Sequence, residues 1–241
     1  METRLKTLSI LIPVYNEEKT VSRVLDSVSQ VALPSGILKQ ILVINDGSSD
    51  NTRKIIEEYM ASHPDDKIAL IHSEINEGKG SSIRKGIEKA TGEFLIIQDA
   101  DLEYDPNEYN LLLKPVLEGH ADIVYGSRFR GSNPHRILFF WHTIGNKFLT
   151  FFSNMFNNQN LTDMETCYKL MNTQLLRQIR LEENRFGFEP EITAKISKIR
   201  DVRIYEVGIS YYGRDFKEGK KINWIDGFRA LWCILKYNLF K

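Results

Sequence analysis

The amino-acid sequence predicts an α/β fold with three layers, in which helices cover a mostly parallel β-sheet. Short apolar runs of strand length alternate, along the first half of the chain, with segments that carry apolar residues at helical spacing. This alternation is typical of βαβ units, whose right-handed crossovers make neighbouring strands parallel. Polar and acidic residues directly follow several of the apolar runs, and open α/β sheets bind their ligands at these strand ends.

The individual elements follow from the same patterns. The expected strands cover residues 8–14, 40–45, 67–72, 94–97, 122–128 and 202–207. Helices are expected where apolar residues recur three or four positions apart, which is the spacing that places them on one face. The residues that mark these helices are Val21, Val24, Leu25 and Val28; Ile55, Ile56 and Tyr59; Ile83, Ile87 and Ala90; and Ile192, Ile196 and Ile199. A further helix is expected from Pro106 to about Glu118.

Composition narrows the class of protein. The chain has 241 residues, 42% of them hydrophobic, which suits one large domain or a domain with an appendage. Lys and Arg balance Asp and Glu at 32 each, so no overall positive field favours a nucleic-acid partner. Two cysteines, Cys167 and Cys233, provide no disulfide framework and fit a reducing cytosol. The first apolar run is too short for a signal peptide, so a cytoplasmic location is expected.

The predicted strand 94–97 runs into two aspartates separated by one residue, Asp99 and Asp101. On extended chain, residues i and i+2 point the same way, so both carboxylates can face one site. Hard carboxylate oxygens suit Mg²⁺ or Mn²⁺. Glu103 continues the same parity and is a candidate third ligand. For an isolated pair of this kind, a solvated turn after a strand would be the usual interpretation.

Other chemically versatile residues also fall just after predicted strands: Asn16, Glu17, Asp46 and Lys79. Gly78-Lys79-Gly80 lacks the spacing of a phosphate-binding P-loop. It could still bring backbone close to a diphosphate, with Lys79 as a point charge. By itself, Asp46-Gly47 would be interpreted as a simple turn.

Four motifs together resemble the glycosyltransferases of family 2, which have the GT-A fold. They are 12–17 (Ile-Pro-Val-Tyr-Asn-Glu), 43–52 (Val-Ile-Asn-Asp-Gly-Ser-Ser-Asp-Asn-Thr), 76–80 (Asn-Glu-Gly-Lys-Gly) and 98–101 (Gln-Asp-Ala-Asp). The resemblance implies a nucleotide-diphosphate-sugar donor, a divalent metal on the two aspartates and inversion at the anomeric carbon. The donor site implied in this way contains Pro13, Tyr15, Asn16, Glu17, Asp46, Gly78, Lys79, Asp99, Ala100 and Asp101.

Within this family, 123–128 and 162–169 resemble the branch of dolichol-phosphate mannosyltransferases and polyprenyl-phosphate glycosyltransferases. The second motif keeps its acid, Asp163, and its terminal cation, Lys169, but departs from the branch between them. The resemblance implies a GDP- or UDP-sugar donor and a polyprenyl phosphate acceptor, with Arg128 and Arg214 as candidates to hold the acceptor phosphate. Residues 211–214 also resemble the basic diphosphate-contacting segment of this branch, so Arg214 would touch either the donor diphosphate or the acceptor phosphate. If the acceptor is instead a sugar hydroxyl, Asp163 is the first candidate for the base, although it can equally position Arg128 or the metal.

Two amphipathic segments, 137–156 and 224–239, are rich in aromatic residues. Polar residues on nearly every turn argue against a membrane span, and a helix lying in the membrane interface fits better. The alternative is a helix whose apolar face packs on the protein's own sheet. We therefore expect a donor-binding core in residues 1–130 and an acceptor-binding part in 131–241. The second part would touch the inner face of the membrane.

Two other functions stay open at this point. A soluble family 2 transferase that modifies a saccharide would share every donor motif and differ only in its acceptor. A non-catalytic, nucleotide-binding α/β protein would keep the fold without the metal-dependent chemistry. The sugar, the lipid length and the oligomeric state leave no mark in the sequence.

Overall fold

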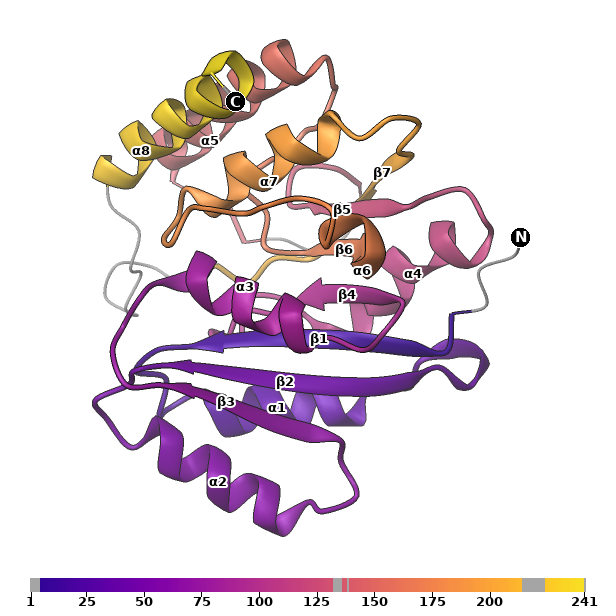
Figure 1. The fold of residues 1–241 in the computed structure, drawn as a ribbon, viewed down its shortest axis with the longest axis vertical. Helices are drawn as coiled ribbons and strands as arrows, with labels where there is room; N and C mark the ends of the chain where they lie inside the picture. The colour runs from indigo at the N-terminus through magenta and orange to yellow at the C-terminus, as the bar shows by residue number, and fades with distance from the viewer. Residues whose placement is uncertain (1–4, 132–135, 138, 214–223, 241) are drawn as a thin grey trace.

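The computed structural model describes residues 5–131, 136–137, 139–213 and 224–240. Within these residues one sheet of seven strands has the order β3-β2-β1-β4-β6-β5-β7. Figure 1 shows the sheet running through the molecule. The strands are β1 (Thr7–Val14), β2 (Leu38–Asp46), β3 (Ile68–Ser73), β4 (Phe94–Ile97), β5 (Ile123–Ser127), β6 (Lys169–Asn172) and β7 (Ile204–Gly208).

Every strand pair is parallel except the two that involve β6, which runs antiparallel to both β4 and β5. The predicted mostly parallel α/β sheet is therefore confirmed. The sequence prediction omitted β6, and the last strand lies at 204–208 instead of 202–207. Because β6 inserts between β4 and β5, the second part of the chain completes the sheet that the first part begins.

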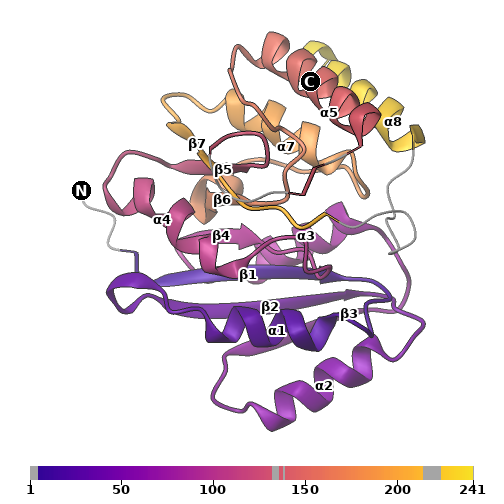
Figure 2. The same ribbon diagram turned by 180° about the vertical axis from the view of Figure 1, so that it is seen from behind.

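Helices cover both faces of this sheet. In Figure 1, α3 lies in front of the strands and α1 lies behind them, and Figure 2 shows the reverse. The predicted helix from Pro106 begins as a short 3₁₀ turn and continues as α4. The helices are α1 (Val21–Gln30), α2 (Thr52–Ser62), α3 (Lys79–Lys89), α4 (Tyr109–Leu117), α5 (Phe140–Asn157), α6 (Thr173–Leu176), α7 (Phe188–Ser197) and α8 (Trp224–Leu235), and a π-helical stretch (Lys236–Phe240) extends α8.

The core lies between the sheet and these helices. The central strand β4 is buried along its whole length, as expected for a continuous apolar run in a parallel sheet. Helix α1 packs in the ordinary way, because its four valine and leucine residues at helical spacing are its buried residues.

Helix α5 packs the other way round. Its buried residues are polar, namely Asn146, Thr150 and Ser153. Most of its aromatic and aliphatic residues are exposed instead: Phe140, Trp141, Ile144, Phe148, Phe151 and Met155. The interpretation in which the apolar face of this segment packs on the protein's own sheet is therefore wrong.

Helix α8 lies beside α5 at the end of the molecule farthest from α2 (Figures 1 and 2). It buries Ala230, Cys233 and Ile234 and exposes Phe228 and Trp232, and the π-helical stretch after it exposes Leu239 and Phe240. We call the exposed apolar residues of α5, α8 and this stretch the aromatic face. Among the described residues, no helix is both long and apolar enough to cross a membrane.

Candidate active site

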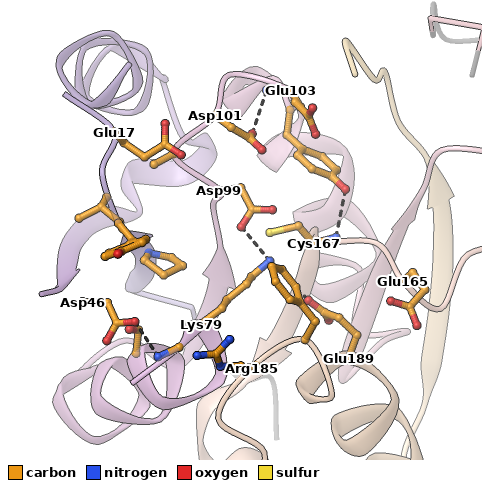
Figure 3. Close-up of a pocket in the computed structure, with 18 of the residues that line it drawn as sticks. Glu17, Asp46, Lys79, Asp99, Asp101, Glu103, Glu165, Cys167, Arg185 and Glu189 are labelled. Carbon is orange, nitrogen blue, oxygen red and sulfur yellow. Dashed lines mark hydrogen bonds and ion pairs between the residues drawn. The ribbon is translucent and has the colours of Figure 1, made fainter. Parts of the chain in front are cut away.

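A cavity of about 430 Å³ opens at the carboxyl ends of β1, β2 and β4. One wall comes from residues just after these strands, and the opposite wall comes from the second part of the chain (Figure 3). Eleven of the residues singled out from the sequence line it: Pro13, Tyr15, Glu17, Asp46, Gly78, Lys79, Asp99, Ala100, Asp101, Glu103 and Arg128. Asn16 and Asp163 do not line it, and Arg214 lies outside the described residues.

Asp101 lies in a turn after β4 and not on extended chain, and Asp99 lies between the strand and this turn. Leu102 has φ +64°, a conformation that is uncommon for a residue with a branched side chain. Asp101 stabilises this turn, since its Oδ1 accepts a hydrogen bond of 3.2 Å from the backbone N–H of Glu103. Asp99 and Asp101 nevertheless both line the cavity.

Lys79 forms an ion pair with Asp99, with 2.8 Å between Nζ and Oδ1. Burial opposes charge on both side chains, but their mutual attraction dominates. The pKa of Asp99 is lowered and that of Lys79 is raised well above its ordinary value. Lys79 Nζ also lies 3.5 Å from Oε1 of Glu189. The lysine is therefore a fixed positive charge next to the aspartates.

Asp46 holds the loop that carries Lys79. Its two carboxylate oxygens accept hydrogen bonds from the backbone N–H groups of Glu77, at 3.0 Å, and Gly78, at 2.7 Å. Gly78 has φ +103°, and a Cβ added there would lie 2.4 Å from the carbonyl oxygen of Asn184. The glycine is therefore required by close approach of two backbone segments of the protein itself.

The loop after β1 is joined to the loop after β2 through Asn16. Its Oδ1 accepts a hydrogen bond of 2.8 Å from the N–H of Ser49, and its own N–H donates to Ser48 Oγ. Asn16 takes φ +53°, which asparagine tolerates better than most residues. Asn16 thus fixes the loop that presents Tyr15 and Glu17 to the cavity.

Arg128 and Asp163 form a bidentate pair. The Nε and Nη2 atoms of Arg128 donate to the two carboxylate oxygens at 2.7 and 2.8 Å, and the backbone N–H of Arg128 donates at 3.0 Å. Asp163 is fully buried. Burial disfavours its charge, yet the guanidinium lowers the pKa of the carboxyl below its ordinary value. This geometry is that of a carboxylate that positions Arg128.

Several cavity residues lie outside the set of site residues predicted from the sequence, and Glu165, Glu189 and Tyr211 are among them. Glu189 forms an ion pair with Lys169, which is fully buried. The Tyr211 hydroxyl donates a 2.7 Å hydrogen bond to Glu103, and its ring lies under the Arg128 guanidinium, 5.2 Å from centroid to Cζ. Only the tertiary fold brings these distant residues together, so spacing in the sequence carries no signal for them.

The carboxylates suit a divalent ion that is shared with a substrate. No group of three or more His, Cys, Asp or Glu side chains within the described residues could hold a metal by itself. The Glu103 carboxylate accepts from Tyr211 and is not gathered with the two aspartates into such a group. Asp99 and Asp101 still present hard oxygen atoms to one cavity, and Mg²⁺ or Mn²⁺ commonly combines one or two carboxylates with substrate phosphate oxygens.

In an α/β sheet, strand ends that present acids and a lysine to one cavity form a ligand site, and these charges suit a charged ligand. Comparison with known proteins identifies the class. Residues 9–180 match the model of glycosyl transferase family 2, and the chain belongs to this family.

Among curated proteins, the chain is 24% identical over 253 residues to the UDP-N-acetylglucosamine–dolichyl-phosphate N-acetylglucosaminyltransferase of Methanococcus voltae, covering 98% of each chain. It is 28% identical over 211 residues to an uncharacterized protein of Methanocaldococcus jannaschii, covering 84% of this chain and 87% of that one.

Among solved structures, it resembles glucosyl-3-phosphoglycerate synthase from Mycobacterium tuberculosis in complex with Mn²⁺ and UDP-glucose. The TM-score is 0.74, with 16% identity, 97% of this chain and 79% of that chain covered. At 16% sequence identity, this similarity shows that the two proteins share a fold.

Proposed function

We propose that this glycosyltransferase moves a sugar from a UDP-sugar to a polyprenyl phosphate, with inversion at the anomeric carbon. The observation that supports a lipid acceptor is the aromatic face. Phe148 and Phe151 of α5 are half or more exposed, while His142 of the same helix lines the cavity. A lipid held at a membrane surface would cover the two phenylalanines and reach His142. The M. voltae relative, named for a dolichyl-phosphate acceptor, supports the same class.

The burial of the polar side of α5 strengthens this proposal. The side-chain Nδ2 of Asn146 lies 3.4 Å from Oδ1 of Asp163, the carboxylate that positions Arg128. The Oγ1 atom of Thr150 accepts a hydrogen bond from the backbone N–H of Met164. The helix is thus fixed by its polar side to the loop beside the cavity. Exposing about six large apolar side chains on one surface is costly in water unless another apolar phase covers them.

The proposed step is a single displacement. An oxygen of the acceptor phosphate forms the bond to the anomeric carbon while the bond from that carbon to the diphosphate breaks, and UDP leaves with the electron pair. The phosphate is already anionic at neutral pH, so no base has to remove a proton. Arg128 would hold this phosphate, and Arg214 remains a second candidate for the same task.

Asp99 and Asp101 would hold Mg²⁺ or Mn²⁺, and the bound ion would neutralise charge that builds on the departing diphosphate. Lys79 supplies a positive charge at the same end of the cavity. Tyr15, Glu17 and Asp46 belong to the wall formed after β1 and β2, where we place the nucleoside of the donor. Asp46 would act there through the loop it holds.

The decisive assay combines UDP- and GDP-sugars with Mn²⁺ and either a polyprenyl phosphate or the matching polyprenol without phosphate. We expect release of UDP that depends on the phosphate, and a glycolipid whose anomeric coupling in NMR shows inversion. Transfer to a soluble saccharide in place of the lipid phosphate would contradict the acceptor assignment. Retention of configuration would contradict the single displacement.

The metal assignment has its own test. Asp101→Ala should lower the turnover number by roughly a hundredfold or more, because it removes charge stabilisation of the leaving group. The melting temperature should hardly change, since the residue lies at the cavity wall and fills no core volume. Asp65→Ala, at an exposed position remote from the cavity, is the matched control. Near-normal turnover of Asp101→Ala in saturating Mn²⁺ would exclude the assignment.

A further inference from the structure

Glu165 lies on the side of the cavity formed by the second part of the chain, away from Glu17 and Asp46 (Figure 3). It belongs to the loop between α5 and β6, two residues after Asp163. No described residue donates a hydrogen bond to its buried Oε1 atom. A buried carboxyl oxygen without a partner in the protein is costly, and such atoms in native proteins call for an explanation, such as a bound ligand or water.

The charged neighbours of Glu165 already neutralise one another. Asp163, on the same loop, is paired with Arg128, which follows β5. Glu189 of α7 is paired with Lys169 of β6. Glu165 is therefore surrounded by two acids and two cations that are paired with one another, and it has no counter-ion of its own. His142 is the residue of α5 that faces the same cavity.

These surroundings favour the neutral form of the Glu165 carboxyl, which predominates below about pH 7 and gives way to the carboxylate above it. Burial, and then repulsion from Glu189, raises the pKa of Glu165 to about 7. A neutral carboxyl has an O–H that can donate a hydrogen bond, which a carboxylate does not have. Arg128 can also donate a hydrogen bond to a ligand, because no acceptor among the described residues binds its Nη1 atom.

We propose that Glu165 is an acceptor-binding residue, whose protonated carboxyl donates a hydrogen bond to the acceptor phosphate beside Arg128. This inference rests on the proposed function, and it adds the residue and the protonation state that recognise the phosphate. The negative charge of the bound phosphate would raise the proton affinity of Glu165 further. Above neutral pH, acceptor binding would therefore take up one proton from solution.

The test uses farnesyl phosphate as a soluble acceptor and compares wild type, Glu165→Gln and Glu165→Ala between pH 6 and 8.5. For wild type, the KM for farnesyl phosphate should rise with pH above 7, approaching tenfold per pH unit. Glu165→Gln should give a KM independent of pH once the common titration of farnesyl phosphate is subtracted, because the amide donates without titrating. Glu165→Ala should raise KM at every pH, while the affinity for UDP stays as in wild type.

Calorimetry supplies a second readout. At pH 8, where free farnesyl phosphate is a dianion, binding enthalpies in two buffers of different ionisation enthalpy give the number of protons taken up. We expect about one proton for wild type and none for Glu165→Gln.

Two results would overturn the inference while leaving the proposed function intact. One is a Glu165→Gln variant whose KM keeps the pH dependence of wild type. The other is a loss of turnover number at all pH values with unchanged KM, which would assign Glu165 as a base. If wild type transfers sugar to no prenyl phosphate while it does use a saccharide, the proposed function and this inference both fail.

Discussion

Helices α1 and α5 are both amphipathic, but they turn opposite sides towards the protein. Helix α1 buries three valines and one leucine against the sheet, and its exposed side is polar. Helix α5 buries an asparagine, a threonine and a serine, and Trp141 at its start is 80% exposed. The periodicity of a helix reveals that it has two sides, but it does not say which side the protein covers. The nature of the neighbouring surface decides this.

The neighbouring surfaces differ for a chemical reason. Beside α1 lie the apolar strands, which can only be covered by apolar side chains. Beside α5 lies the loop 161–164, whose buried polar groups require partners: Asn154 bonds both backbone groups of Leu161, and Asn146 reaches Asp163. The polar side of α5 satisfies these groups. Helix α1 thus covers the apolar core with its apolar side, whereas α5 exposes its apolar side to the surroundings.

The largest effect on stability should come from breaking the buried ion pair of Arg128 and Asp163 beside α5. Asp163→Ala would leave Arg128 buried without a counter-charge, and such changes cost about 3–5 kcal/mol in the free energy of unfolding. The chain contains a matched control in Asp122→Ala, which breaks the pair with Arg203. That pair has the same three-bond geometry but lies at the surface, with about half of the Arg203 side chain exposed.

The control should cost about 1 kcal/mol or less. Urea unfolding of both variants measures the difference. Equal losses would mean that the buried Arg128–Asp163 pair stabilises the protein no more than the surface pair of Arg203 and Asp122 does.

A second pair of substitutions compares the two helices directly. Leu25→Ala removes a fully buried side chain of α1 and should lower the free energy of unfolding by about 3 kcal/mol. Ile144→Ala removes a side chain of α5 that is exposed to water, so the change should stay within about 0.5 kcal/mol. Chemical denaturation of the free protein is the measurement. A large loss for Ile144→Ala would show that the aromatic face is covered within the molecule.

The aromatic face should matter only when an apolar phase is present. The double variant Phe148→Ser, Phe151→Ser should bind vesicles containing anionic lipid roughly thirtyfold more weakly than wild type, since insertion of the exposed parts of these two half-exposed rings contributes about 1 kcal/mol each. Leu111→Ser, Leu117→Ser changes two exposed leucines of α4 and is the matched control. Co-sedimentation and melting temperature should be measured together. A wild type that ignores vesicles, or a double variant that melts far lower, would contradict the membrane proposal.

The smallest effect concerns pH. Because the pKa of Glu165 is raised to about 7 in the folded protein, its contribution to stability is fully present below the unfolded pKa and is lost as pH rises through 7. Glu165→Gln should therefore make the free energy of unfolding fall less between pH 5 and 8, by on the order of 1 to 2 kcal/mol. Denaturant midpoints at these two pH values test the sign. Parallel pH profiles would place the Glu165 carboxyl in contact with water.

Local patterns predicted the first part of the fold well, because a buried parallel strand such as β4 is a continuous apolar run whose end is marked by charged residues. Strand β6 was missed because it has only four residues and starts at Lys169, a buried lysine that its pair with Glu189 makes acceptable. Asp99, Asp101 and Lys79 were found because they follow strands or match a family motif. Glu165 and Tyr211 were not, because only long-range packing places them at the cavity.

The position of β6 also affects how the protein reaches its native state. β4 pairs with β6 through contacts such as Ile96 to Leu170, so the centre of the sheet cannot close until most of the chain is available. Until then one edge of β4, the strand that leads to Asp99 and Asp101, is unpaired and apolar, and such edges invite aggregation. During synthesis, this edge stays open while the ribosome makes the residues of α5. A fragment ending near residue 130 should therefore form inclusion bodies instead of a separate nucleotide-binding unit.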